Sequence, residues 1–201
     1  SYLPLTADSI FVWGRAQREK LIQWGCEPNR VRVTGCGRYS YYQSMNPRKI
    51  RKRIARSIGF DPNKKIISVA FMISAPQRRR LFDRYQQELL GDVLALISKY
   101  PQCECVIKFK NRKDANYDFC RQWQKKHSSA SRFFLVEDVD SLMLILASDA
   151  VIVHNTTFGI EALALKKPVI SYYDKFVALW EEFKPYKGFL IANSRKELDK
   201  I

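Results

Sequence analysis

From residue 65 onward, apolar runs and amphipathic segments alternate along the chain in a regular order. Nearly continuous apolar runs, typical of strands buried on both faces, predict strands at residues 66–71, 105–109, 133–136, 150–153 and 168–172. Apolar positions at helical spacing predict the intervening helices at residues 79–99, 114–127, 141–147 and 156–165. A last strand at 189–191 precedes Ser194-x-x-Glu197, a pattern typical of a helix start. This order predicts an α/β fold with a Rossmann-like, doubly wound parallel sheet.

Ahead of this alternation lies a strongly amphipathic helix. Residues 47–58 place three isoleucines on one stripe, with Asn46 as candidate cap, proline at the first position and Gly59 at the end. Six of these twelve residues are lysine or arginine. Such a basic helix fits either a solvated surface or contact with an anionic lipid surface, and both interpretations stay open.

The first 46 residues have a shorter β–α–β pattern. Strands are predicted at residues 8–14 and 30–35, with a helix at 15–24 between them and a polar, tyrosine-rich connection at 37–46. We therefore predict two domains, a βαβ-like segment over residues 1–46 and a Rossmann-like domain over residues 47–201.

The apolar stretches of the sequence are too short to predict a membrane-spanning helix. The longest apolar stretch is broken at Ser148-Asp149 and falls far short of the roughly 20 residues that a spanning helix needs. No basic-then-apolar leader follows Ser1, so we expect an excised fragment without targeting information. Five cysteines, with no second pair at zinc-ligand spacing, predict a reduced, cytoplasmic chain without disulfide framework or zinc site.

The charge is strongly positive and unevenly distributed. Lysine and arginine number 35 against 20 acids, a net charge of +15. Residues 1–130 hold 26 bases and 10 acids, whereas residues 131–201 hold 9 and 10. Such a surface suits nucleic acid, an anionic membrane, an acidic polymer or a phosphorylated substrate, and charge alone does not select among them. No nucleic-acid motif accompanies it, so nucleic acid is the weakest of these candidates.

The most informative loop is His154-Asn-Thr-Thr-Phe-Gly-Ile-Glu161, which follows a predicted buried strand and opens a helix. Ligands of open parallel sheets bind beyond the carboxyl ends of strands, so this loop is a candidate binding site. Its threonines and glycine offer hydroxyls and an unobstructed backbone to a phosphate, and its glutamate can accept hydrogen bonds from ribose hydroxyls. Alternatively, Asn155 or Thr156 only caps the helix, and His154 has a structural role.

The run from Leu146 to Ile170 resembles the donor-site signature of GT-B glycosyltransferases. The segment Thr156-Thr-Phe-Gly-Ile-Glu-Ala162 matches the Ser/Thr-Thr-x-Gly-x-Glu-Ala pattern of these enzymes. The chain departs from the pattern at Lys166, where the family commonly has glycine before Pro-Val-Ile. The similarity is greatest to bacterial surface-carbohydrate and capsule enzymes, with sugar-nucleotide 2-epimerases as structural relatives. Val33-Thr-Gly-Cys-Gly-Arg38 resembles the crossing between the two GT-B halves.

The resemblance implies that the chain is the C-terminal, donor-binding half of such an enzyme, with residues 1–46 as the crossing segment. Lys108 matches the lysine of a family Lys-x-His-Pro segment, whose His-Pro pair is replaced by Lys110-Asn111. We expect both lysines to offset donor phosphate charge, with solvated edge lysines as the alternative. The loop at residues 72–78 is expected to face the cleft between the halves or to be a plain polar loop. The predicted substrate-binding residues are His154, Asn155, Thr156, Thr157, Gly159, Glu161, Lys108, Lys110, Ser74, Gln77 and Arg78.

The implied function is transfer of a glycosyl or phospho-alditol group from a nucleotide-activated donor to a glycan or lipid-linked acceptor in cell-surface polysaccharide synthesis. No catalytic residue is assigned. No metal is expected, because helix N-termini and basic side chains can neutralise the leaving nucleotide, and no cofactor is expected, because the nucleotide sugar is a substrate. The expected partners are that donor, the acceptor, an N-terminal GT-B half and a peripheral membrane contact on the cytoplasmic side. Two alternatives stay open: a sugar-nucleotide 2-epimerase, and a non-catalytic basic module that binds nucleic acid or an acidic polymer.

Overall fold

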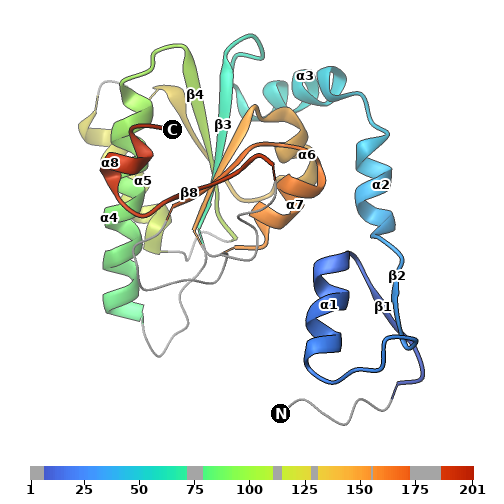
Figure 1. Cartoon of the computed structure of the whole chain (residues 1–201). Helices are drawn as coiled ribbons and strands as arrows, with labels where there is room; N and C mark the ends of the chain where they lie inside the picture. The colour runs from blue at the N-terminus through green and yellow to red at the C-terminus, as the bar shows by residue number, and fades with distance from the viewer. Residues whose placement is uncertain (1–6, 72–78, 111–114, 128–130, 155, 173–186) are drawn as a thin grey trace. The chain divides into compact units, whose positions relative to one another are not determined.

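The computed structural model describes residues 7–71, 79–110, 115–127, 131–154, 156–172 and 187–201. The chain divides into two compact units, residues 1–44 and residues 45–201, each with its own buried core (Figure 1). In the part of the chain described, no helix is both long enough and apolar enough to span a membrane.

The first unit is a parallel strand pair joined by one helix. β1 (Ile10–Val12) pairs with β2 (Val31–Val33), α1 (Arg15–Gln23) connects them, and a small core lies between them. The predicted β–α–β order is observed, but the expectation of a connection at 37–46 is wrong, because α2 (Gly37–Gln43) is a helix. None of the α2 residues is buried, so the segment lacks the apolar stripe by which sequence patterns reveal a helix.

The second unit alternates strands and helices as predicted, with most ends shifted by one or two residues. In chain order its elements are α3 (Pro47–Ile58), β3 (Lys65–Phe71), α4 (Arg79–Ser98), β4 (Cys103–Lys108), α5 (Ala115–Lys126), β5 (Phe133–Val136), α6 (Ser141–Ala147), β6 (Ala150–His154), α7 (Phe158–Ala164), β7 (Val169–Tyr172), β8 (Phe189–Ala192) and α8 (Arg195–Leu198).

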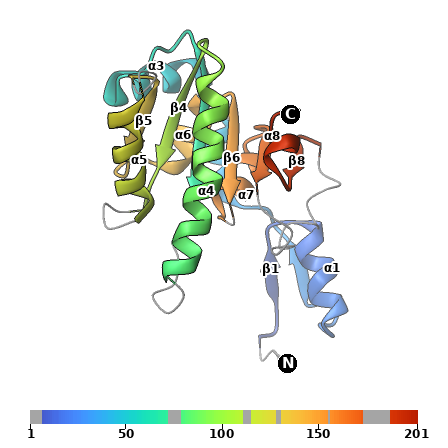
Figure 2. The ribbon, with the colours of Figure 1, turned by 90° about the vertical axis from the view of Figure 1, so that its left-hand side faces the viewer.

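These strands form one parallel sheet in the order β5-β4-β3-β6-β7-β8. Counted from β3, this is the Rossmann order, in which the strand order reverses between β3 and β6. Helices α4 and α5 pack together on one face, and α3, α6 and α7 cover the other (Figures 1 and 2). The predicted doubly wound α/β class is therefore confirmed.

The amino edge of the sheet, where β3 and β6 begin, is held together by charged side chains. The Arg51 guanidinium of α3 donates from Nε to the Pro62 carbonyl (2.8 Å) and from Nη1 to Asp149 Oδ2 (2.9 Å). The same carboxylate oxygen accepts from the backbone N–H of Ile66 (2.8 Å). Burial opposes ionisation of Asp149, but these two donors outweigh it and lower the pKa of the carboxyl. The Arg51 and Asp149 side chains at this edge are therefore hydrogen-bonded within the protein.

The turn between α7 and β7 explains the departure at Lys166. The Lys166 N–H donates to the Leu163 carbonyl and the Lys167 N–H donates to the Ala162 carbonyl, which is the Schellman arrangement for ending a helix. Lys166 has a φ of 58°, the left-handed conformation for which glycine is the usual choice. The lysine thus keeps the turn geometry of the family pattern, and β7 follows it.

Candidate functional site

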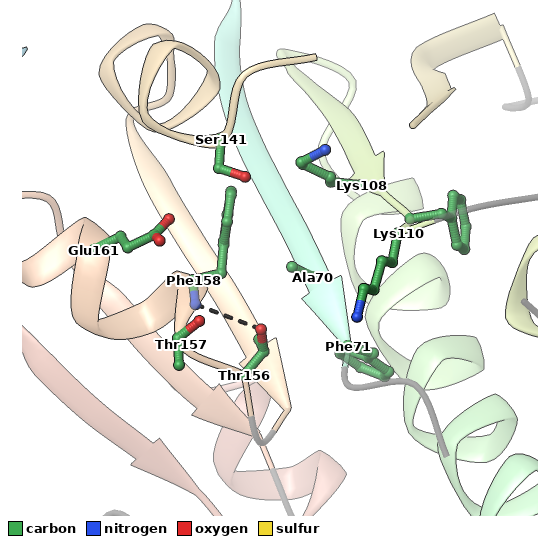
Figure 3. A pocket seen from close by; sticks show the side chains of 10 residues that line it. Ala70, Phe71, Lys108, Lys110, Ser141, Thr156, Thr157, Phe158 and Glu161 are labelled. Atoms are coloured by element: carbon green, nitrogen blue, oxygen red, sulfur yellow. Dashed lines mark hydrogen bonds between the residues drawn. The ribbon is translucent and has the colours of Figure 1, made fainter. Parts of the chain in front are cut away.

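A pocket opens beyond the carboxyl ends of β3, β4 and β6, at the point where the strand order reverses (Figure 3). Its volume is about 560 Å³, within the range of small-molecule sites. The pocket is lined by Ala70, Phe71, Lys108, Phe109, Lys110, Ser141, Thr156, Thr157, Phe158 and Glu161. Open α/β sheets bind their ligands at this place, so the pocket is the candidate site.

The two predicted lysines both line the pocket, on its β4 side. Lys108 is the last residue of β4, and Lys110 follows two positions later, beyond the end of the strand. Phe109, between them, is buried and packs edge-on against Tyr117 of α5, with 5.3 Å between ring centroids. This packing fixes the backbone that carries the two ammonium groups.

Lys108 is half-buried and surrounded by acidic residues. Its Nζ donates a hydrogen bond to the Glu137 carbonyl (2.8 Å). Burial lowers the pKa of the ammonium group, while the nearby carboxylates of Asp138, Asp140, Glu161 and Glu137 act in the opposite direction. The amine is thus oriented before a ligand arrives. A phosphate at the pocket mouth would meet this cation together with the exposed Lys110.

Thr156, Thr157 and Phe158 form the floor of the pocket. Thr157 is the N-cap residue of α7, and its side chain makes no capping hydrogen bond, whereas Thr156 Oγ1 accepts a long hydrogen bond (3.4 Å) from the Phe158 N–H. The alternative that Thr156 only caps the helix therefore has weak geometric support. Both threonines line the pocket, where their hydroxyls can meet a ligand.

Gly159 has a packing role that the sequence did not indicate. A Cβ at this position would lie 3.1 Å from Val153 Cγ2 and 3.5 Å from Val169 Cγ1. The glycine lets α7 lie directly on β6 and β7, which sets the height of the pocket floor. It does not line the pocket, and its contact with a phosphate stays a prediction.

Glu161 and Ser141 close the pocket on the side opposite the lysines. Figure 3 shows Glu161 reaching in from α7, with the Phe158 ring between it and the lysines and Ser141 above that ring. Ser141 opens α6, and Asp140 caps this helix by accepting a hydrogen bond from the Met143 N–H (2.9 Å). The cap fixes the first turn of α6 and therefore the position of Ser141 at the pocket. A carboxylate and a hydroxyl here suit hydrogen bonding to sugar hydroxyls.

His154 lies outside the pocket. It is fully buried at the end of β6, and its Nδ1 is 3.1 Å from the Tyr172 carbonyl. Its ring packs against Phe71 and Tyr85, with centroid distances of 5.5 and 5.6 Å, and burial lowers its pKa. This geometry favours the structural alternative, because the buried imidazole contacts the end of β7, and substrate binding by His154 stays a prediction.

Of the remaining predicted site residues, Asn155, Ser74, Gln77 and Arg78 lie outside the described residues. Two residues that line the pocket, Ser141 and Phe158, were not predicted from the sequence, and each is the first residue of a helix. Ser141 follows an acidic cap, which was a usable signal, whereas Phe158 is indistinguishable from a core residue in the sequence.

Within the described ranges, no group of histidine, cysteine, aspartate or glutamate side chains is arranged to hold a metal ion. The five cysteines are free thiols, and burial raises the pKa of Cys105. The pocket chemistry therefore consists of ammonium, hydroxyl, carboxylate and aromatic groups.

Comparison with known proteins identifies relatives of the chain. The family described as "Capsule polysaccharide biosynthesis protein" matches residues 79–180. None of the curated proteins matches the sequence significantly. The observed elements and this match together confirm the expected kind of domain, a GT-B half of the polysaccharide-synthesis type.

Solved structures show the fold in more detail. UDP-GlcNAc 2-epimerase from Methanocaldococcus jannaschii is 16% identical, with a TM-score of 0.66, and 96% of this chain matches 54% of that one. A putative UDP-N-acetylglucosamine 2-epimerase from Listeria monocytogenes is 17% identical, with a TM-score of 0.67 and coverage of 96% and 50%. Anabaena HepE, solved with UDP and glucose, is 15% identical, with a TM-score of 0.55 and coverage of 96% and 52%. The similarity is one of fold, and the chain spans about half the length of these proteins.

Proposed function

This chain belongs to the capsule polysaccharide biosynthesis protein family, and we propose that its second unit binds the nucleotide-activated donor of a glycosyltransferase. The enzyme would transfer a glycosyl or phospho-alditol group to a glycan or lipid-linked acceptor. The observation that carries the proposal is the pocket at the reversal of strand order, which brings Lys108, Lys110 and Glu161 together from separate elements.

The chemistry of the pocket suits a sugar nucleotide. Two ammonium groups on the β4 side would neutralise the donor phosphates, and the hydroxyls of Thr156 and Thr157 would donate hydrogen bonds to phosphate oxygens. Glu161, on the α7 side, would accept hydrogen bonds from a ribose. The same cations would stabilise the negative charge that develops on the departing nucleotide, the step at which such a site contributes to the rate. HepE was solved with UDP and glucose, which supports a uridine nucleotide as the first ligand to test.

The proposal also concerns where the acceptor binds. His154 is buried and does not line the pocket, so it is not placed to act there as a general base. We propose that a second GT-B half supplies the acceptor site, as in enzymes that bind donor and acceptor on facing domains. The chain spans about half of its structural neighbours, which supports this division.

A sugar-nucleotide 2-epimerase is the second candidate, because two of the structural neighbours carry that name. Both candidates require the same donor pocket and differ in the product. Inversion at C2 of the sugar in UDP-GlcNAc would identify the epimerase, whereas release of the nucleotide only when an acceptor glycan or lipid is present would identify the transferase.

A thermal-shift and calorimetric panel of UDP, CMP, CDP and GDP tests the shared donor pocket. We expect one nucleotide to stabilise the protein selectively, and Glu161→Ala to weaken its binding by at least about tenfold, the equivalent of one charged hydrogen bond. The matched control is Glu88→Ala, which removes an exposed carboxylate from α4, outside the pocket. Equal affinity of both variants and the unsubstituted protein would contradict the proposed pocket. Binding of generic DNA with steep salt dependence, with no nucleotide selectivity, would instead favour the non-catalytic basic module.

A further inference from the structure

Helix α3 exposes a continuous surface of positive charge. Its exposed bases are Arg48, Lys49, Lys52, Arg53 and Arg56, and we refer to these five residues as the α3 basic face. At 100° per residue they cover one side of the helix. Ile50 and Ile54 lie on the opposite side and Ala55 on its flank, and all three are buried in a helix that packs on α6.

The α3 basic face is held rigidly by the fold. The Asn46 side chain accepts hydrogen bonds from the Arg48 and Lys49 N–H groups (3.0 and 3.2 Å), and Gly59 ends the helix with a φ of 99°. Arg51, which lies on the flank, is bound to Asp149 and to the carbonyls of neighbouring loops. One base of the helix therefore serves the fold, and the other five point to solvent.

These five charges oppose the stability of their own helix. Arg48 and Lys52, Lys49 and Arg53, and Lys52 and Arg56 are like-charged pairs at i, i+4 spacing, an arrangement that destabilises a helix. No acidic residue occurs in α3 to offset them. The packing on α6 uses only the apolar stripe, so folding does not require the repulsive side. An anionic partner would turn this repulsion into attraction.

The position of α3 separates that partner from the nucleotide pocket. Arg51 contacts the segments that lead into β3 and β6, so α3 lies at the amino edge of the sheet. The pocket lies beyond the carboxyl ends of the same strands. A small ligand in the pocket therefore does not reach the α3 basic face, and a partner of this face would bind separately.

We propose that the α3 basic face binds the surface of an anionic phospholipid bilayer. A 12-residue helix presents its charges along about 18 Å of a convex surface, which fits a plane of phosphate headgroups. Single-stranded nucleic acid is typically bound by aromatic platforms along a groove, whereas the exposed residues of α3 are the five bases, Pro47 and Ser57. Because Pro47 is the one exposed apolar residue of α3, the contact is electrostatic adsorption without deep insertion.

Co-sedimentation with lipid vesicles tests the proposal. The 201-residue protein is mixed with vesicles of phosphatidylcholine, or of phosphatidylcholine with about 30% phosphatidylglycerol, and we expect binding only to the latter, falling as salt is raised. The triple variant Lys49→Gln, Lys52→Gln, Arg53→Gln should bind roughly 100-fold more weakly, at about fivefold for each base removed. Because the removed pairs are repulsive, its melting temperature should stay equal or rise.

The matched control removes the same charge from α5, through Arg121→Gln, Lys125→Gln and Lys126→Gln, three exposed bases of that helix. This variant should bind vesicles nearly as the unsubstituted protein does. Equal loss in both triple variants would overturn the proposal, since net charge alone would then explain binding. Failure of the protein to prefer anionic vesicles would also overturn it, as would equally tight binding of duplex DNA at the same phosphate concentration. Nucleotide binding in the pocket is measured separately and is independent of these outcomes.

Discussion

The two edges of the main sheet use the same kinds of charged side chain in different ways. At the amino edge, Arg51, Asp149 and Lys167 are committed to backbone groups and to one another. At the carboxyl edge, Lys108, Lys110 and Glu161 line a pocket of about 560 Å³, although Lys108 also donates a hydrogen bond to the Glu137 carbonyl. The difference is that the charges of the amino edge face other parts of the protein, whereas those of the carboxyl edge face a cavity that a ligand can enter. The comparison predicts that substitutions at one edge change stability and substitutions at the other change binding.

The largest effect is expected at the amino edge. Asp149→Ala removes the acceptor of both the Ile66 N–H and the Arg51 guanidinium. Leaving these donors unsatisfied should cost about 2–3 kcal/mol of unfolding free energy, measured by urea denaturation. Affinity for the nucleotide should not change, because Asp149 lies at the far end of β6 from the pocket. A loss of affinity at unchanged stability would reverse the assignment of the two edges.

The contribution of Asp149 should also depend on pH. Its pKa is lowered in the folded protein, so the ionised carboxylate stabilises the fold above its ordinary value of 3.8. This stabilisation is lost as the pH falls through the lower, folded-state pKa. The difference in urea midpoint between the unsubstituted protein and Asp149→Asn should therefore shrink from pH 7 towards about pH 3. A difference that grows under acid would show that the ion pair with Arg51 is not its source.

At the carboxyl edge, Lys110→Ala should change binding without changing stability. Lys110 is exposed, so its attraction to a donor phosphate is screened by water and is worth up to about 1 kcal/mol. We expect up to about fivefold weaker nucleotide binding in calorimetry at low salt, and an unchanged melting temperature. If the melting temperature fell instead, this lysine would belong with the structural charges of the amino edge.

The smallest effect is expected at the turn between α7 and β7. Lys166 adopts a φ of 58°, which is strained for any residue with a Cβ. Lys166→Gly should relieve this strain, and after the greater entropy of glycine in the unfolded chain is counted, a gain of about 0.5–1 kcal/mol remains. Urea denaturation measures the gain. A destabilised Lys166→Gly variant would mean that the lysine side chain contributes a contact that outweighs the strain.

Much of the fold could be predicted from the sequence because buried parallel strands leave nearly continuous apolar runs. The strands at Phe133–Val136 and Ala150–His154 were predicted within one residue for this reason. Helix α2 could not be predicted in the same way, since it buries no residue and so carries no stripe. The pairing order of the strands also leaves no local trace in the sequence.

Residues of the candidate site could be predicted where polar side chains follow the end of a strand. Lys108, Lys110, Thr156, Thr157 and Glu161 are polar residues at the end of a predicted strand or in the loop and helix that follow one, and the structure brings them to one pocket. His154 satisfied the same rule, but its side chain turns into the core, a direction that sequence position does not determine. Phe158 was missed because a lining aromatic has the same pattern as a core residue.

One calorimetric titration tests the difference between the edges most directly. The nucleotide that stabilises the protein most is titrated, under conditions where all three proteins are folded, into the unsubstituted protein, Glu161→Ala and Asp149→Ala. The account predicts that Asp149→Ala binds as tightly as the unsubstituted protein despite its lower stability, and that Glu161→Ala loses at least about tenfold in affinity at an unchanged melting temperature. Equal affinity of Glu161→Ala and the unsubstituted protein for every nucleotide that binds would contradict the central claim that this pocket holds the donor.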